Sequence, residues 1–445
     1  MPGTSVVELV ATRFMPEDAR ALATFASDPG WSDILKTILI KFPPGLTGIR
    51  VKTFFSESYV PTVSEWGLRP IMSLTACGIS ILPLSSILRT YVFGIFGRIN
   101  KMWERLINMW VLNKNRFPMS FPLIRLDTNE NPYGASPKAI LAYLRCAGRL
   151  NRYPDYEEYK SVLASRLGLA PENILPVPGS DRGLQVLLQY LSKNYERVVI
   201  PSPSFLMYTR FSRLCFKKVE RVACWLGRDW DSVLSLSGRD AVLLAGSPNN
   251  PTGEVVGESL VKRLLQEFGM VVLDEAYYEY YGVSMATMLK DFENLVLVRT
   301  FSKAYGLASL RSGYLIGSRR ILKEVAEYTG PFDVPAPAVE ASKAALQDEE
   351  WLRMVVDATL SNRIWMLREL NSMEEVEAYD SNANYILVRV RDAKSVFEKL
   401  LEKRIVVRLV TPEWGGIGES FLRVTVGSWR EVSLFACALK SVLQN

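Results

Sequence analysis

The amino-acid sequence predicts an α/β protein with a mostly parallel β-sheet. Four short apolar runs, at residues 197–201, 241–245, 270–273 and 295–299, are bounded by loop residues, and most are separated by segments of helical length such as 260–268. Strands that alternate with helices favour a parallel sheet covered by helices on both faces. Ligands of such sheets bind at the carboxyl ends of the strands, so the loops that follow these runs are the candidate site.

The composition excludes several classes of chemistry. The chain has 445 residues, 48% hydrophobic and 22% charged, with a net charge of +6 that is too mild to indicate nucleic-acid binding. It contains no histidine, which excludes Ser–His–Asp and Cys–His catalysis and histidine-containing zinc sites. Proton transfer must therefore use Lys, Asp, Glu, Tyr or a cofactor. The five scattered cysteines form no C-x-x-C pair, which indicates free thiols and a cytoplasmic protein without a metal site.

Residues 1–118 differ from the remainder of the chain. They hold 13 basic and 8 acidic residues, and so carry most of the net charge. Residues 71–88 are uncharged and just reach the length of a membrane-spanning helix. Gly78, Pro83 and several hydroxyl side chains in this stretch argue against a span, so we expect none. An extension of unknown role and an overextended gene start both remain open, because Met119 lies just before the first clear motif.

Polar side chains follow three successive predicted strands. They are an amide, a carboxylate, a phenol, two hydroxyls, a lysine and an arginine: Asn250, Asp274, Tyr277, Thr300, Ser302, Lys303 and Arg311. These groups should converge on one edge of the sheet. In a chain without histidine, Lys303 is the natural candidate for covalent and base chemistry through a Schiff base with a carbonyl.

This set of groups is what a pyridoxal 5'-phosphate site needs. A lysine holds the aldehyde, a carboxylate pairs with the pyridine nitrogen, and an amide and a phenol bind the ring hydroxyl. Hydroxyls, an arginine and a helix N-terminus hold the phosphate, and Gly179-Ser180-Asp181 opens a predicted helix. Each residue alone is equally typical of a turn, a helix cap or an exposed ion pair. Their joint order and spacing favour the cofactor site.

From about residue 121 onwards the sequence resembles the fold-type I, pyridoxal-phosphate-dependent aminotransferases of class II, and within them it is similar to the histidinol-phosphate aminotransferase family. The segments that carry the resemblance are LDTNENPYG at 126–134, RYP at 152–154, SNANY at 381–385 and LRVTVG at 422–427. The resemblance implies a homodimer, with a large domain built on a mostly parallel sheet and a smaller α+β C-terminal domain. The implied division is an extension (1–118), an N-terminal arm (119–152), a large cofactor-binding domain (153–325) and a small domain (326–445).

The resemblance also implies a role for each site residue. Lys303 would be the Schiff-base lysine and Asp274 the partner of the pyridine nitrogen, while Asn250 and Tyr277 would bond the ring hydroxyl. Phe205 takes the place of a ring-stacking tyrosine. The residues implied around the cofactor phosphate are Ser180, Asp181, Thr300, Ser302 and Arg311. Those implied for the substrate are Arg423 for its acidic group, Arg408 for its phosphate, and Tyr153 acting in the neighbouring subunit's site.

The implied reaction moves an amino group between glutamate/2-oxoglutarate and imidazole-acetol phosphate/histidinol phosphate, in histidine biosynthesis. The implied partners are a phosphorylated amine and a 2-oxo acid, with no nucleic acid. Two enzyme alternatives remain: a threonine-phosphate decarboxylase, and an aromatic aminotransferase, which is favoured if Arg408 points away from the pocket. A third alternative, from a different class, is a non-catalytic membrane- or partner-binding protein on the same scaffold.

Overall fold

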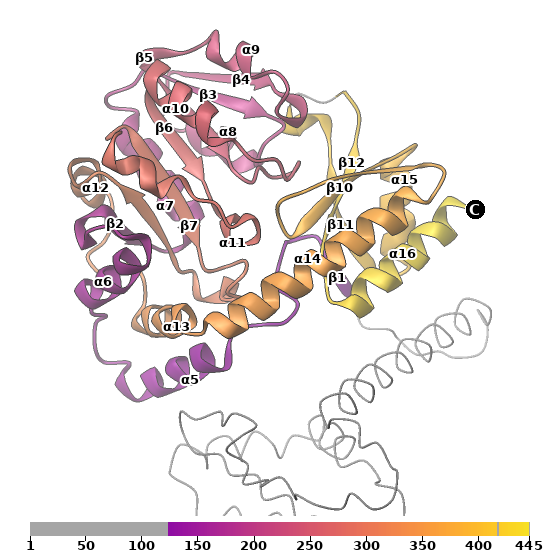
Figure 1. Ribbon diagram of the computed structural model, residues 1–445, viewed down its shortest axis with the longest axis horizontal. Coiled ribbons are helices and arrows are strands. Elements are labelled where there is room, and N and C mark those ends of the chain that lie inside the picture. Colours follow the sequence, from indigo (N-terminus) through magenta and orange to yellow (C-terminus); the bar gives the residue numbers. More distant parts are fainter. Residues whose placement is uncertain (1–122, 416–417, 445) are drawn as a thin grey trace, which may run out of the picture. The chain divides into compact units, whose positions relative to one another are not determined.

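The computed structural model describes residues 123–415 and 418–444, so the predicted extension and its apolar segment 71–88 lie outside the described residues (Figure 1). The strands are β1 (Ile124–Leu126), β2 (Ile174–Val177), β3 (Arg197–Ser202), β4 (Lys218–Ala223), β5 (Gly238–Gly246), β6 (Phe268–Asp274), β7 (Leu295–Thr300), β8 (Gly313–Gly317), β9 (Val376–Tyr379), β10 (Tyr385–Val390), β11 (Ile405–Val410) and β12 (Phe421–Thr425). The α-helices are α5 (Pro137–Cys146), α6 (Tyr156–Leu167), α7 (Gly179–Leu191), α8 (Leu206–Ser212), α9 (Trp230–Leu234), α10 (Glu258–Glu267), α11 (Tyr278–Tyr281), α12 (Arg319–Ala326), α13 (Ala336–Leu346), α14 (Glu349–Asn371), α15 (Ala393–Glu402) and α16 (Trp429–Leu443).

The large sheet has seven strands in the order β2-β8-β7-β6-β5-β3-β4. Strands β7, β6, β5, β3 and β4 are parallel to one another, whereas β8 runs antiparallel to both β7 and β2. The four predicted strands are β3, β5, β6 and β7, which are neighbours at the centre of this sheet. The prediction of a mostly parallel sheet is confirmed.

Helices cover both faces of the large sheet, which is why its central strands each contain an uninterrupted apolar run. Alternate residues of β5 belong to different cores, since Leu243 packs in the core that includes α10 and α13, and Leu244 packs in the core that includes α7 and α12. The same alternation holds in β6 for Leu273 and Val272. The large sheet is therefore a rigid, buried layer, and its strand ends are positioned by packing on two sides.

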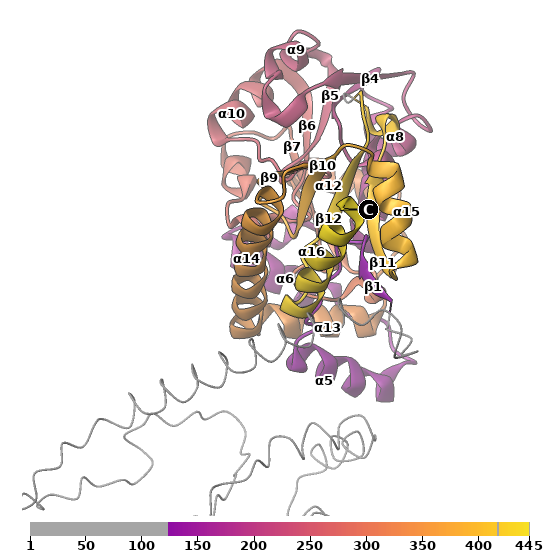
Figure 2. The same ribbon diagram turned by 90° about the vertical axis from the view of Figure 1, so that its right-hand side faces the viewer.

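The small sheet has five strands in the order β1-β11-β12-β10-β9, of which only β1 and β11 are a parallel pair. Helices α14, α15 and α16 lie against one face and stand in front of the sheet in Figure 2. Leu422 and Val424 point into that helical core. Because side chains alternate along a strand, Arg423 and Thr425 lie on the opposite face.

Helix α14 links the two cores. Leu352, near its start, packs against the core of the large sheet, whereas Met366 and Leu370 belong to the core of the small sheet. Helix α13 packs with the large sheet, and the arm supplies β1 to the small one. The domain boundaries at 152/153 and 325/326 stay predictions. Helix α14 and the arm each contribute to the packing of both sheets or link them, so the two parts share these segments.

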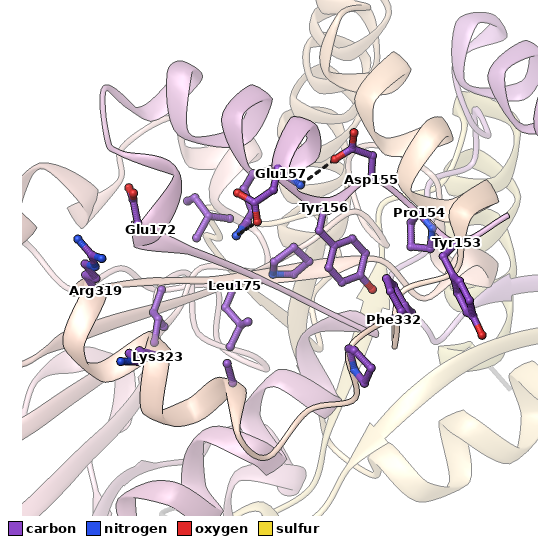
Figure 3. Close-up of a pocket in the computed structure, with 16 residues that line it drawn as sticks. Tyr153, Pro154, Asp155, Tyr156, Glu157, Glu172, Leu175, Arg319, Lys323 and Phe332 are labelled. Atoms are coloured by element: carbon purple, nitrogen blue, oxygen red, sulfur yellow. Dashed lines mark hydrogen bonds and ion pairs between the residues drawn. The ribbon is translucent and has the colours of Figure 1, made fainter.

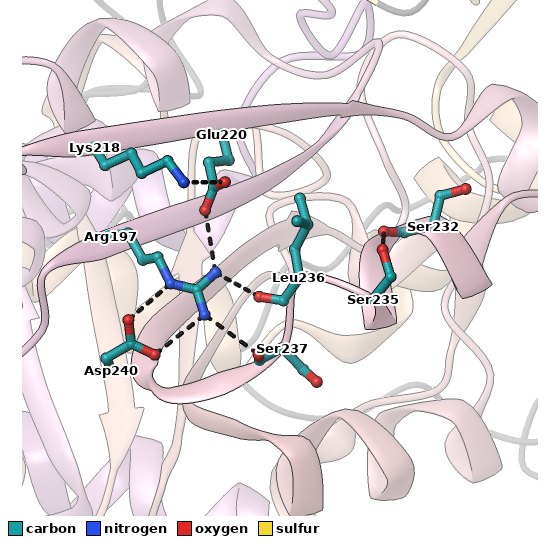
Figure 4. Close-up of polar contacts among 8 residues, drawn as sticks. All are labelled: Arg197, Lys218, Glu220, Ser232, Ser235, Leu236, Ser237 and Asp240. Carbon is teal, nitrogen blue, oxygen red and sulfur yellow. Dashed lines mark hydrogen bonds and ion pairs between the residues drawn. The ribbon is translucent and has the colours of Figure 1, made fainter.

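Arg197, the first residue of β3, connects the amino-terminal halves of strands β3, β4 and β5 through ion pairs and hydrogen bonds (Figure 4). Its guanidinium donates to both carboxylate oxygens of Asp240 (2.8 and 3.1 Å) and to Glu220 (3.1 Å). It also donates to the carbonyls of Leu236 and Ser237. A guanidinium with this many acceptors holds β3, β4 and β5 together and leaves no donor for a ligand.

None of the helices in the described part of the chain is both long enough and apolar enough to cross a membrane. Within the same residues, no cluster of acidic or cysteine side chains is arranged to hold a metal ion. The cysteines that the structure describes are free thiols, of which Cys146 and Cys224 are buried.

Candidate active site

Three neighbouring strands end at one level and bring the predicted residues to a single edge of the large sheet. Gly246 at the end of β5 pairs with Asp274 at the end of β6, and Asp274 pairs with Val298 of β7. The loops that contain Asn250 and Lys303 follow directly. The convergence expected from a parallel sheet is therefore present in the structure.

Asp274 is a buried carboxyl, 6% exposed, held by two neutral donors. The backbone N–H of Ala276 donates to its Oδ1 (3.0 Å), and the hydroxyl of Tyr208 donates to its Oδ2 (2.8 Å). Burial raises the pKa of Asp274 to about 6, against the opposing effect of these hydrogen bonds. A carboxyl in this setting is well suited to a cationic partner such as a protonated ring nitrogen.

Tyr208 is a site residue that the sequence analysis did not identify. It lies one helical turn after Phe205, and the two rings meet edge to face with centroids 5.6 Å apart. The signal that could have found it is the spacing of three residues, which puts both aromatic rings on one side of a helix that starts at a strand end.

Replacing Tyr208 with Phe should weaken binding of pyridoxal phosphate, the cofactor expected from the sequence, roughly tenfold or more, because a hydrogen bond to a charged group contributes about 1.5–3 kcal/mol. The dissociation constant is measured by titrating the cofactor-free protein with cofactor and following the visible absorbance. Tyr195→Phe is the matched control, since the Tyr195 hydroxyl donates to the Gly269 carbonyl away from the site. Equal dissociation constants for Tyr208→Phe and the unmodified protein would contradict the role of this hydroxyl.

Lys303 lies beside the aromatic ring of Tyr277, and its Nζ is 5.6 Å from the ring centroid. The amine donates to the carbonyl of Thr128 (3.0 Å), and none of the ion pairs among the described residues includes it. This hydrogen bond to a neutral carbonyl holds the amine in place. The amine is thus positioned for covalent and base chemistry.

Arg423 is a buried guanidinium with an unused donor. Its Nη1 donates to Oδ1 of Asn250 (2.7 Å) and its Nη2 to the carbonyl of Asp127. Its Nε is buried and has no hydrogen-bond partner among the described residues, and burial lowers its pKa. An unpartnered buried donor on a cation fits an acidic group of a ligand.

The start of α7 forms an anion cradle with Arg311. The helix begins at Gly179 without a side-chain cap, so its first N–H groups remain free for a ligand. Gly179 has φ of +78°, and a Cβ there would lie 2.7 Å from Nη2 of Arg311, so only glycine lets the guanidinium approach. Arg311 also lies 3.7 Å from Asp181 and 3.5 Å from Oγ of Ser302, which accepts from Thr300 (2.9 Å). With Ser180 at the second position of α7, the structure brings all five residues predicted for the phosphate together.

Tyr153 and Arg408, both predicted to bind the substrate, are exposed in the single chain. Tyr153 is 77% exposed and stacks on Phe332, with ring centroids 4.2 Å apart, at the end of a cavity of about 760 Å³ that none of the other predicted residues lines (Figure 3). Arg408 is exposed on β11 and lies directly across from Arg423 in the register of β11 and β12. Because directly opposed residues point to the same face, Arg408 belongs to the face that holds Arg423.

Asn129 is a second residue whose role the sequence analysis missed. It is 1% exposed and hydrogen-bonded through its amide to the hydroxyls of Tyr277 and Thr425, both at 3.0 Å. In the sequence, Asn129 was notable only because it lies in the segment 126–134. That segment supports the family resemblance, but the resemblance implied no role for Asn129.

Residues 122–438 match the family model described as aminotransferase class I and II. The chain belongs to the class I and II aminotransferases. This aminotransferase is 33% identical over 331 residues to histidinol-phosphate aminotransferase 2 of Archaeoglobus fulgidus, an alignment that covers 73% of this chain and 96% of the relative. The family resemblance predicted from the sequence is confirmed.

Solved structures agree with this assignment. The aminotransferase matches the histidinol-phosphate aminotransferase of Sinorhizobium meliloti in complex with pyridoxal-5'-phosphate with a TM-score of 0.66 and 25% identity, over 72% of this chain and 91% of that one. The L-threonine-O-3-phosphate decarboxylase of Porphyromonas gingivalis matches with a TM-score of 0.64 and 24% identity, over 72% and 100%. This second likeness shows the fold alone, and the fold-type I architecture expected from the sequence is confirmed.

Proposed function

We propose that this aminotransferase uses pyridoxal 5'-phosphate to move an amino group between glutamate and imidazole-acetol phosphate, which yields 2-oxoglutarate and histidinol phosphate. The observation that carries the proposal is the placement of Lys303, Asp274 and Arg423 around one edge of the large sheet, with an uncapped helix start beside them. The names of the relatives support the choice of substrate.

The residues present fit the cofactor. Asp274 would face the ring nitrogen, Asn250 and Tyr277 the ring hydroxyl, and Phe205 the ring face. The phosphate would be surrounded by Ser180, Asp181, Thr300, Ser302 and Arg311, some of them through backbone groups alone, where free helix N–H groups and a guanidinium make a natural dianion site. When bound, pyridoxal phosphate supplies an aldehyde that condenses with amines and a ring that accepts carbanion electrons.

The side chains of this chain would perform the proton transfer and the orientation of the substrate. Lys303 Nζ would take the proton from the carbon that bears the substrate amine and hold it for return, as general base and then general acid. Buried Arg423 would bind the acidic group of the substrate through its unpartnered Nε, which fixes that carbon near the lysine. The surrounding burial of Asp274 and Arg423 excludes bulk water from these charges.

Arg408 would distinguish phosphorylated substrates from plain amino acids, because it adds donors on the face that already holds Arg423. Arg408→Ala should raise the KM for histidinol phosphate by roughly 10- to 100-fold while changing the KM for glutamate far less. Arg389→Ala is the matched control, since Arg389 is an exposed strand arginine of the same sheet that pairs with Glu377 and Glu419. Equal rises in KM for histidinol phosphate and glutamate would remove Arg408 from phosphate recognition.

The proposed reaction is tested by adding histidinol phosphate alone to the cofactor-loaded protein. Rapid conversion of the visible cofactor band to the pyridoxamine form supports the amino transfer from a phosphorylated amine. An unchanged band that aromatic amino acids convert would instead assign general aromatic transamination. Release of carbon dioxide from threonine phosphate, without a half-reaction with glutamate, would assign the decarboxylase.

We also propose a homodimer in which Tyr153 adds a hydroxyl to the neighbouring subunit's site. The support is a tyrosine that is largely exposed in the single chain and stacks on Phe332, itself 45% exposed. Sedimentation of a fully active monomer would contradict this proposal. The free thiols of the described cysteines favour a cytoplasmic location, which fractionation of the source cells would test.

A further inference from the structure

We propose that Asn129 is a positioning residue that fixes the direction of the Tyr277 hydroxyl proton, so that Tyr277 donates a hydrogen bond towards the cofactor's ring oxygen. This inference rests on the proposed function and deepens it, since it concerns how one side chain of the site is prepared for pyridoxal phosphate. It follows from the hydrogen bonds that surround a single buried amide.

The orientation of the Asn129 amide is set by Thr425. The backbone N–H of Asn129 donates to Oγ1 of Thr425 (3.0 Å), so the proton of that hydroxyl points elsewhere, and Oδ1 of Asn129 accepts it (3.0 Å). The left-handed backbone of Asn129, with φ of 55°, lets its N–H and its side-chain carbonyl meet the same hydroxyl. With the amide turned over, the buried Thr425 hydroxyl would lose the acceptor that the structure gives it and would face an amide donor instead.

The amide nitrogen of Asn129 therefore faces Tyr277. Nδ2 donates to the Tyr277 hydroxyl (3.0 Å), and an amide nitrogen can only donate. The phenol oxygen is thus an acceptor on this side, and its own proton is directed away from Asn129. A phenol that accepts one hydrogen bond is also a stronger donor in a second hydrogen bond. The hydrogen bond from Asn129 therefore both orients the Tyr277 hydroxyl and makes it a stronger donor.

Asn129 is fixed between the two sheets. Its carbonyl accepts from Nδ2 of Asn384 (3.1 Å) beside the small sheet, while Tyr277 follows the end of β6 in the large sheet. The Tyr277 ring is held in turn by an edge-to-face contact with Tyr385, with centroids 5.1 Å apart. The two preceding carbonyls of the arm, those of Asp127 and Thr128, accept from Arg423 and Lys303. Three successive arm residues thus contact three groups of the site.

The test is a pH titration of the visible absorbance of the bound cofactor. Asn129→Gly removes the amide and tolerates the left-handed backbone. Asn129→Asp replaces the donor with an acceptor, so that Tyr277 turns its proton towards the arm. Without the hydrogen bond from Tyr277, the ring oxygen of the bound cofactor would be more basic, so the protonated form of the bound cofactor would persist to a higher pH. We expect the midpoint pH of the titration to rise in both variants. For Asn129→Asp the rise should be about one pH unit or more, which is a tenfold change in proton affinity.

A double-mutant cycle separates positioning from general destabilisation. In a Tyr277→Phe background, Asn129→Gly should shift the midpoint by less than about 0.3 pH unit, which is the usual error of additivity. Asn173→Asp is the matched control, because it removes a comparable hydrogen bond, from the Asn173 amide to the Gly317 carbonyl (2.9 Å), far from the site. This variant should leave the midpoint unchanged. If the Asn129 variants do not fold, Thr425→Val frees the amide and should raise the midpoint as well.

Two results would overturn the inference: a midpoint in the Asn129 variants equal to that of the unmodified protein, or a shift by Asn129→Gly that persists in full without the Tyr277 hydroxyl. The failure of the proposed function looks different. In that case the unmodified protein would either show no visible cofactor band, or show a band that histidinol phosphate does not convert.

Discussion

Lys303→Ala should abolish the visible band of the bound cofactor and lower turnover by at least about 10³-fold, because general acid–base catalysis alone contributes roughly 10²–10⁴-fold and the covalent attachment is lost as well. The Lys303 amine is held by the Thr128 carbonyl, and among the described ion pairs none includes Lys303. Absorbance spectroscopy and stopped-flow turnover measure the two effects separately.

Lys303→Arg provides the matched comparison for this result. The arginine keeps the positive charge but cannot form a Schiff base or readily give up its proton. It should therefore lose the band and the turnover as completely as the alanine variant. A band that survives in either variant would show that another lysine holds the cofactor.

Asp274→Asn should weaken cofactor binding and slow turnover by roughly 10²–10³-fold, while making the cofactor-free protein more stable at pH 8. Burial raises the pKa of Asp274 from 3.8 to about 6, so keeping it ionised above pH 6 costs the folded state about 3 kcal/mol. The asparagine carries no charge to desolvate, and its amide can still serve both Tyr208 and the Ala276 N–H.

The pH dependence has a definite sign. Between about pH 4 and 6 the folded state binds more protons at Asp274 than the unfolded chain does, so this group's contribution to the free energy of unfolding falls as the pH rises through that window. Above about pH 6 it is constant. Denaturant unfolding of the cofactor-free protein at pH 4.5 and 8 should show a clearly larger gain for Asp274→Asn at the higher pH. A gain of the same size at both values would contradict a raised pKa.

The sequence predicted the strand-end residues because local patterns encode them. The run 241–245 is apolar at every position since β5 is buried on both faces, and the polar loop that follows has to lie at the sheet edge. Lys303 and Asp274 were predicted in this way, since Asp274 is the last residue of β6 and Lys303 lies shortly after the end of β7. The uncapped start of α7 was likewise readable from Gly179 and its neighbours.

The residues that were missed depend on contacts between distant parts of the chain. Tyr208 lies 66 positions before Asp274, and Asn129 lies 148 positions before Tyr277. No local periodicity reports such pairs, because they form only when the sheets and the arm have assembled. The strand β4 was missed for a different reason, since its residues KVERVA are half-exposed at the sheet edge and lack the apolar run of a central strand.

The pairing of β1 with β11 has a consequence for how the protein is made. Ile124 lies opposite Ile405, so the arm leaves the ribosome long before its partner strand exists. At about 5–20 residues per second, that interval is on the order of tens of seconds. The arm carbonyls that hold Lys303 and Arg423 can take their places only afterwards. The large sheet is thus complete once β8 (Gly313–Gly317) has been made, whereas the ability to transfer an amino group arrives only after β11 (Ile405–Val410).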